Sequence, residues 1–195
     1  SEIFFNELEI PKPNYFLNIN GLSHGAMTGR MLEGVEKVLH KESPDLVLVY
    51  GDTNSTIAGS LAAKKLHIKV AHVEAGLRSF NIKMPEEVNR ILTDRISDIL
   101  FCPTDTAVNN LKNEGFENFN CEIVKNGDVM QDAAMFYSKE SSKRSDIVNN
   151  LNLDGYILCT IHRAENTDDD HRIKNIVDAL NDISRETRIV FPILP

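Results

Sequence analysis

The stretch VLVYGDTNSTIAGSLAAKKLHIKVAHVEAGLRSFNIKMPEEVNR, residues 47–90, decides the fold of this chain. An apolar run at 46–50 ends in the turn Gly51-Asp52-Thr53, and a helical pattern follows it. A second apolar run at 68–73 ends in Glu74-Ala75-Gly76, and another helix opens at Pro85. Short buried-type strands that alternate with helices are typical of a parallel βαβ unit. Ligands of such sheets bind outside the carboxyl ends of the strands, so the two turns are the first places to look for a site.

Carboxylates are concentrated at this expected edge, where Asp52, Glu74 and Glu86 all fall. Taken singly, each has a structural explanation: Asp52 could cap the helix that begins near Asn54, and Glu86 could complement the dipole of its own helix. The same segment also carries basic and amide side chains: His72, Arg78, Asn89 and Arg90. Acids crowded beside cations at a ligand edge are typical of proton-transfer sites, because burial and neighbouring charges separate their pKa values.

Composition limits the classes of function. With 195 residues and 42% hydrophobic content the chain can bury a core and form one or two domains. A net charge of −8 argues against a nucleic-acid or anionic-membrane surface. The sequence shows no apolar run of membrane-spanning length, and its first residues do not resemble a signal peptide. We therefore expect no nucleic-acid partner and no membrane partner.

The cysteines are isolated from one another, at Cys102, Cys121 and Cys159. Each lies in or beside an apolar run, and none forms a CxxC pair. We therefore expect buried, reduced thiols in a cytosolic protein, with no metal or redox role.

Hydrophobic periodicity predicts further elements on both sides of the central stretch. Upstream it predicts the end of a helix at 1–8, a strand at 15–17 and a helix after Ser23. Downstream it predicts strands in alternation with helices: strands at 99–102, 121–124, 156–161 and 188–193, and helices after 103–105 and at about 170–186. The polar, serine-rich segment at 138–152 is typical of a crossover between domains.

Several separated blocks resemble the non-hydrolysing UDP-N-acetylglucosamine 2-epimerases. The blocks are YGDTNSTIAG (50–59), AHVEAGLRSFN (71–81), MPEEVNRILTDRISDILFCPT (84–104), NGDVMQDA (126–133) and CTIHRAENTDD (159–169). The resemblance implies an α/β fold: a Rossmann-like parallel-sheet domain of a two-domain glycosyltransferase-B-type fold, with the start of a second Rossmann-like domain. It implies an N-terminal domain at 1–138 that lacks its first strand-turn-helix, a crossover at 139–154 and the beginning of a truncated UDP-binding domain at 155–195.

The family's reaction inverts C2 of UDP-N-acetylglucosamine to give UDP-N-acetylmannosamine for cell-surface polysaccharide synthesis. UDP is eliminated, a 2-acetamidoglucal forms, and UDP adds back while a proton reaches the opposite face of C2. By motif, the catalytic positions are Asp52, Glu74, Glu86 and His162. Asp52 and Glu74, from adjacent strand ends, are expected to act near C2. His162, from the second domain, is expected to face them as an acid or a phosphate contact.

Further positions are expected to contact the substrate. Arg163 is the strongest candidate for the diphosphate, because a guanidinium fork matches phosphate oxygens. Arg90 and Arg78 are weaker candidates, since each could instead pair with Glu74, Glu86 or Glu87. The remaining expected contacts are Asn89, Thr53 and Glu165. The resemblance implies no cofactor, no metal, a cytoplasmic homodimer and little turnover by this chain alone, because most of the family's UDP-binding half lies beyond Pro195.

Two departures from the family pattern leave the substrate open. The loop at 79–84 is more similar to that of relatives acting on UDP-2,3-diacetamido-glucuronic acid, where Lys83 could meet a sugar carboxylate; a surface lysine is the simpler explanation. Leu194 stands where relatives often carry a histidine. The alternative functions are a glycosyltransferase, a hydrolysing relative and a non-catalytic nucleotide-sugar-binding module. A dinucleotide-dependent oxidoreductase is disfavoured because no GxGxxG turn follows a strand.

Overall fold

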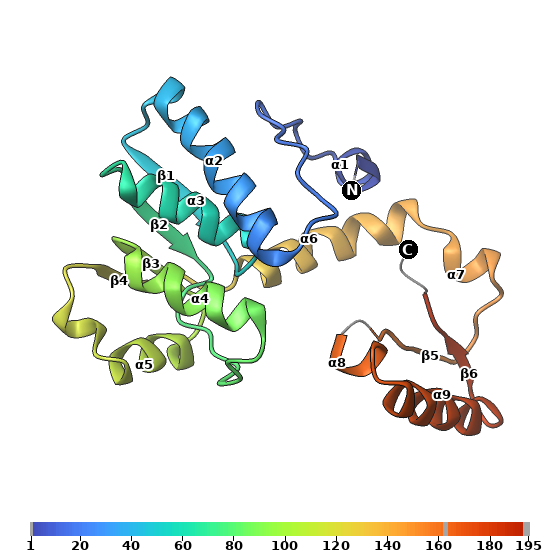
Figure 1. Cartoon of the computed structure of the whole chain (residues 1–195). Helices are drawn as coiled ribbons and strands as arrows, with labels where there is room; N and C mark the ends of the chain where they lie inside the picture. The colour runs from blue at the N-terminus through green and yellow to red at the C-terminus, as the bar shows by residue number, and fades with distance from the viewer. Residues whose placement is uncertain (1, 162–163, 193–195) are drawn as a thin grey trace. The chain divides into compact units, whose positions relative to one another are not determined.

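The computed structural model describes residues 2–161 and 164–192, and it divides into two compact units, Ser1–Tyr137 and Ser138–Pro195 (Figure 1). Each unit is described by itself. Among the described residues, no helix is both long enough and apolar enough to cross a membrane.

The first unit is built around a four-stranded parallel sheet in the order β1-β2-β3-β4. Its elements are α1 (Glu2–Glu7), α2 (His24–Glu42), β1 (Leu46–Tyr50), α3 (Asn54–Lys65), β2 (Lys69–Val73), α4 (Pro85–Ile96), β3 (Ile99–Cys102), α5 (Asp105–Asn113), a 3-10 turn η1 (Phe116–Asn118), β4 (Glu122–Lys125) and most of α6 (Val129–Arg144). The parallel βαβ reading of the central stretch is confirmed.

Helix starts follow from local chemistry. Thr53 caps α3 through a reciprocal pair of hydrogen bonds with Thr56, so the predicted cap at Asp52 is wrong. Asp52 is thereby left free for other partners. Helix α4 begins with Pro85 in its first turn, where the missing N–H costs nothing, and carries Glu86 and Glu87 near its positive end.

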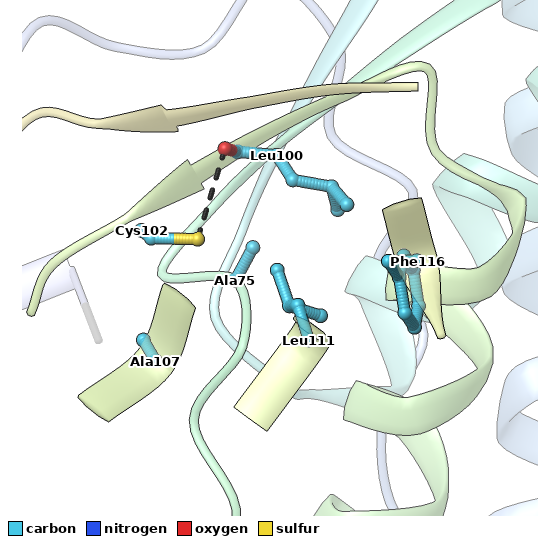
Figure 2. Packing of buried hydrophobic residues seen from close by; sticks show 6 residues of the cluster. All are labelled: Ala75, Leu100, Cys102, Ala107, Leu111 and Phe116. Atoms are coloured by element: carbon cyan, nitrogen blue, oxygen red, sulfur yellow. Dashed lines mark hydrogen bonds between the residues drawn. The ribbon is translucent and has the colours of Figure 1, made fainter. Parts of the chain in front are cut away.

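The core lies on one face of the sheet. Val49, His72 and Leu100 are register partners, so their side chains share that face. One apolar cluster joins α2 and α3 to the sheet: Leu39, Val49, Ala62, Ala63 and Val70. Figure 2 shows the second cluster, which gathers around the end of β3: Ala75, Leu100, Cys102, Ala107, Leu111 and Phe116. Burial raises the pKa of the Cys102 thiol to about 12, which keeps this thiol protonated and inert.

The predicted strand at 15–17 is wrong, because the described chain is not in a strand there. The segment instead contacts α2. The Tyr15 hydroxyl donates to Glu42, Lys41 Nζ lies 5.0 Å from the centre of the Tyr15 ring, and Leu17 packs against Gly34. Apolar residues that look like a strand in the sequence are used here to contact a helix.

The second unit contains a single parallel βαβ arrangement. It includes the end of α6, then α7 (Ile147–Asn150), β5 (Tyr156–Leu158), α8 (Ala164–Thr167), α9 (Asp170–Ser184) and β6 (Arg188–Val190). Strands β5 and β6 pair in parallel, and both are shorter than predicted. Helix α9 is capped by Asp169, whose carboxylate accepts the N–H groups of His171 and Arg172 at 3.0 and 3.1 Å.

Candidate active site

Two of the predicted acids meet at the carboxyl ends of neighbouring strands. Asp52 follows β1 and Glu74 follows β2, and the strands pair in parallel up to Tyr50 and Val73. Glu74 Oε2 lies 3.6 Å from the position a Cβ on Gly51 would occupy, directly beside Asp52. Burial raises the pKa of Glu74, the charge of Asp52 raises it further, and the opposing effect of Arg90 does not reverse the direction. The predicted proximity of these carboxylates is thus present in the geometry.

Asp52 is held by α4 through both its side chain and its backbone. Arg90 forms an ion pair with the Asp52 carboxylate, and Asn89 Nδ2 donates to the Asp52 carbonyl at 2.9 Å. The Glu74 carboxylate, by contrast, forms no hydrogen bond or ion pair with another described residue. The two acids therefore sit in unequal environments, one beside a guanidinium and one partly desolvated. Such asymmetry is how enzymes give paired carboxylates different protonation roles.

The backbone of Glu74 is in the left-handed region, with φ at +78°. This conformation is unfavourable for a residue with a side chain, and costs of order 1–3 kcal/mol are typical of such positions. The turn is stabilised by two adjacent N–H groups, those of Glu74 and Ala75, which both donate to the Phe101 carbonyl at 3.1 and 3.0 Å. The chain thus turns sharply at the end of β2 while keeping a carboxylate at this edge.

Glu87 connects the loop before α4 to this pair of acids. It is only 1% exposed, and its carboxylate accepts hydrogen bonds from the N–H groups of Ser79 and Phe80, each at 2.9 Å, and from Arg90 Nη1 at 2.7 Å. Burial alone would raise the pKa of Glu87, but these donors outweigh it and lower the pKa. Arg90 thereby bridges Glu87 and Asp52. In the sequence this position is marked only by the acidic doublet Glu86-Glu87 after Pro85. In the structure only Glu87 of the two is buried.

The remaining predicted residues of the first unit are placed differently. Glu86 is exposed in the first turn of α4 and makes no hydrogen bond or ion pair with another described residue. The Thr53 hydroxyl contacts Ser55 and Thr56 at 2.7 and 3.1 Å, which ties it to the start of α3. Asn54 Nδ2 lies 3.3 Å from His24 Nδ1, so the start of α2 also reaches this edge.

Arg78 lies beneath the edge, not on it. Its side chain is 1% exposed and forms ion pairs with Asp94 and Glu114, each at 2.7 Å. The alternative pairings considered for Arg78, with Glu74, Glu86 or Glu87, are wrong. Asp94 was not singled out from the sequence, although it follows Arg90 by one helical turn on α4, and this spacing places the two side chains on one face.

Three predicted site residues belong to the second unit, and their side chains are not described. His162 and Arg163 lie outside the described residues, as does the side chain of Glu165. Their roles stay predictions.

The raised pKa of Glu74 predicts a stability change in Glu74→Gln. Between the ordinary glutamate pKa of 4.5 and the higher folded-state value, the folded protein binds more protons than the unfolded chain. The Glu74 carboxyl group therefore makes the free energy of unfolding fall as the pH rises through this window. The variant has no carboxyl group at this position, so it lacks this decrease. We expect Glu74→Gln to gain stability relative to the wild type as the pH is raised from 4 toward neutrality.

Urea unfolding at a series of pH values measures this difference. Glu122→Gln, which removes an exposed carboxylate on β4, is the matched control for one lost surface charge. The difference in free energy of unfolding between Glu74→Gln and the wild type should change more steeply with pH than the same difference for the control. Equal slopes would contradict the assigned environment of Glu74.

The fold and the site together define a Rossmann-like α/β domain with two acids at the carboxyl ends of neighbouring strands. The family model described as UDP-N-acetylglucosamine 2-epimerase matches residues 1–195, and the chain belongs to this family. The chain is 59% identical over 196 residues to UDP-2,3-diacetamido-2,3-dideoxy-D-glucuronate 2-epimerase of Pseudomonas aeruginosa, covering 100% of this chain and 54% of that protein.

Solved structures agree with the family assignment. The UDP-GlcNAc 2-epimerase of Methanocaldococcus jannaschii, in complex with UDP-GlcNAc and UDP, superposes with a TM-score of 0.91 at 49% identity, covering 100% of this chain and 54% of that one. The enzyme of Neisseria meningitidis, bound to UDP-GlcNAc, gives 0.87 at 33% identity, covering 98% and 54%. The chain spans about half the length of the relatives it matches.

Proposed function

We propose that the protein bearing this chain inverts C2 of a UDP-linked 2-acetamido sugar, converting UDP-N-acetylglucosamine into UDP-N-acetylmannosamine. The observation that carries the proposal is the pair of unequal carboxylates, Asp52 and Glu74, at adjacent strand ends of a family member. Inversion at C2 needs two proton-handling groups and a place for the departing diphosphate.

The geometry supports different roles for Glu74 and Asp52 in proton transfer at C2. Burial and the charge of Asp52 raise the pKa of Glu74, and its carboxylate pairs with no other described residue, so Glu74 is suited to carry a proton. Asp52 is fixed by Arg90 and Asn89, which gives the second proton-handling group a defined orientation. The elimination of UDP leaves a 2-acetamidoglucal, and re-addition of UDP with protonation from the other face completes the inversion.

Other predicted residues complete the proposed site. Glu86, exposed at the start of α4, is available to the sugar or to side chains that surround it. We assign His162 and Arg163 to the leaving diphosphate on the strength of the sequence blocks that contain them. Arg78 is not part of this proposal, because its guanidinium is buried between Asp94 and Glu114.

A second candidate substrate is UDP-2,3-diacetamido-glucuronic acid. The relative at 59% identity carries that activity in its name. In this chain the side chain of Lys83 is exposed on the loop before α4. Its backbone N–H donates to Asn81 Oδ1 at 3.2 Å, and its ammonium has no hydrogen bond or ion pair with another described residue. An unshielded ammonium at this position suits a sugar carboxylate.

The test is to incubate the full-length gene product in deuterated water with each of the two UDP-sugars. We expect deuterium at C2 and a product of manno configuration from at least one of them, detected by proton NMR. An acceptor-dependent product without C2 exchange would indicate a glycosyltransferase. Free sugar plus UDP would indicate a hydrolysing enzyme, and binding without exchange a sensor module; each of these results contradicts the proposal.

The family resemblance also supports finer proposals for the whole protein. We propose a cytoplasmic homodimer that supplies an activated sugar for cell-surface polysaccharide synthesis. The measured mass of the full-length gene product in solution tests the assembly.

A further inference from the structure

A hydrogen-bonded network of buried charged and polar side chains lies beneath the two turns that carry the acids. His72 and Asp94 are each 0% exposed. His72 Nε2 lies 2.8 Å from the Gly51 carbonyl, which immediately precedes Asp52, and His72 Nδ1 lies 2.7 Å from Asp94 Oδ1. One imidazole ring thus joins the end of β1 to helix α4.

The other carboxylate oxygen of Asp94 extends this network to the second turn. Asp94 Oδ2 accepts hydrogen bonds from the N–H of Gly76, two residues after Glu74, at 3.0 Å, and from Arg78 Nη1 at 2.7 Å. Arg78 then donates to both oxygens of Glu114, at 2.7 and 2.9 Å. The carboxylate of Asp94 is therefore fully engaged, and it holds the turn that contains Glu74.

The hydrogen-bonding groups fix the direction of these contacts. A carbonyl oxygen only accepts, so Nε2 of His72 donates to Gly51. Nδ1 lies 2.7 Å from Asp94 Oδ1, and hydrogen bonds between an imidazole and a carboxylate are shorter and stronger than those between neutral groups. In consequence, the backbone beside Asp52 and the backbone beyond Glu74 are tied to one rigid pair of side chains.

Stability alone does not account for this arrangement. Buried ionic groups can often be replaced by apolar residues of similar volume without loss of stability, because desolvation offsets their attraction. The register partners of His72 on the same face are Val49 and Leu100, so an apolar residue would suit the sheet. The network instead binds two backbone groups, at Gly51 and Gly76, that flank the acids.

We propose that His72 and Asp94 are positioning residues that set the spacing between Asp52 and Glu74 for proton transfer at C2. The inference rests on the proposed function and deepens it. Neither residue touches the sugar; both act through the backbone of the turns. A displacement of about 1 Å in a reacting group can cost on the order of 100-fold in rate, so a small shift of either turn is sufficient.

The test uses the full-length gene product carrying Asp94→Asn. We expect kcat for C2 inversion to fall by about 100-fold with KM nearly unchanged, because the reacting groups are displaced while the diphosphate contacts are not. The primary isotope effect on kcat, measured with substrate deuterated at C2, should rise, since proton transfer becomes slow relative to binding and release.

Asp98→Asn is the matched control. Asp98 accepts the Val70 N–H at 2.9 Å and Lys64 Nζ at 2.6 Å, near the opposite end of β2. It is therefore another carboxylate that binds one backbone N–H and one cation, but far along the strand from the acids. We expect this variant to lose stability without a change in kcat or in the isotope effect.

A second substitution protects the test against misfolding. His72→Gln retains an amide that can donate to Gly51, so its kcat should fall less than that of His72→Leu. Circular dichroism establishes the folded fraction of each variant. Wild-type kcat and isotope effect in folded Asp94→Asn and His72→Leu would overturn the inference, and so would loss of kcat only in proportion to the folded fraction. Absence of C2 exchange in the wild-type protein would instead overturn the proposed function.

Discussion

Glu74→Gln is expected to lower C2 proton exchange by the full-length gene product by about 10²–10⁴-fold, the usual contribution of a general acid–base group. The amide has nearly the size of the carboxyl group but cannot carry the proton. The pKa of Glu74 is raised, first by burial and then by the charge of Asp52, which favours the protonated form that an acid in this reaction needs. Deuterium incorporation at C2, followed by NMR with either UDP-sugar, measures the effect.

The control is again Glu122→Gln, which removes a carboxylate on β4 away from the two turns. It should leave exchange unchanged. Binding of UDP, measured by calorimetry, should survive in Glu74→Gln because the lost group handles the C2 proton. Exchange within tenfold of the wild type would remove Glu74 from the proton-transfer step.

Arg78→Met is expected to lower the free energy of unfolding by about 3–5 kcal/mol, the usual cost of removing one partner of a buried ion pair. The guanidinium is 1% exposed and neutralises Asp94, which is 0% exposed. Its removal leaves that carboxylate buried beside His72 without its guanidinium partner. Urea denaturation at neutral pH measures the loss.

Arg95→Met provides the comparison for Arg78→Met. Arg95 is an exposed guanidinium of α4, 4.8 and 4.5 Å from the ring centres of Phe116 and Phe119, and contacts of this kind contribute about 0.5–1 kcal/mol. The double variant Arg78→Met with Asp94→Leu should recover part of the stability, because the uncompensated charge is gone. Equal small losses from Arg78→Met and Arg95→Met would contradict the ion-pair account.

Much of the fold could be predicted from the sequence because strand and helix patterns are local. The apolar runs before Asp52 and Glu74 correspond to β1 and β2, and the strand at 99–102 matches β3. The prediction failed at 15–17, where Tyr15 and Leu17 contact α2 and Phe16 is 76% exposed. An apolar run in the sequence does not show whether its side chains are buried, nor which element they contact.

The site was predictable in outline for the same reason. The sheet edge places Asp52 near Glu74, as parallel strands require. The partners of Arg78 were not predictable, because Asp94 and Glu114 lie 16 and 36 positions away and meet it only in the folded chain. The burial of Glu87, and not of Glu86, was not predictable either. It depends on the loop at 79–84, whose Ser79 and Phe80 N–H groups donate to Glu87.

The left-handed backbone at Glu74 has a consequence for protein engineering. Glycine and asparagine adopt this conformation at lower cost than glutamate does. Libraries screened for heat resistance alone would therefore favour those residues at this turn and discard the carboxylate. A redesign that is meant to keep the proposed proton transfer has to hold position 74 fixed and change other positions.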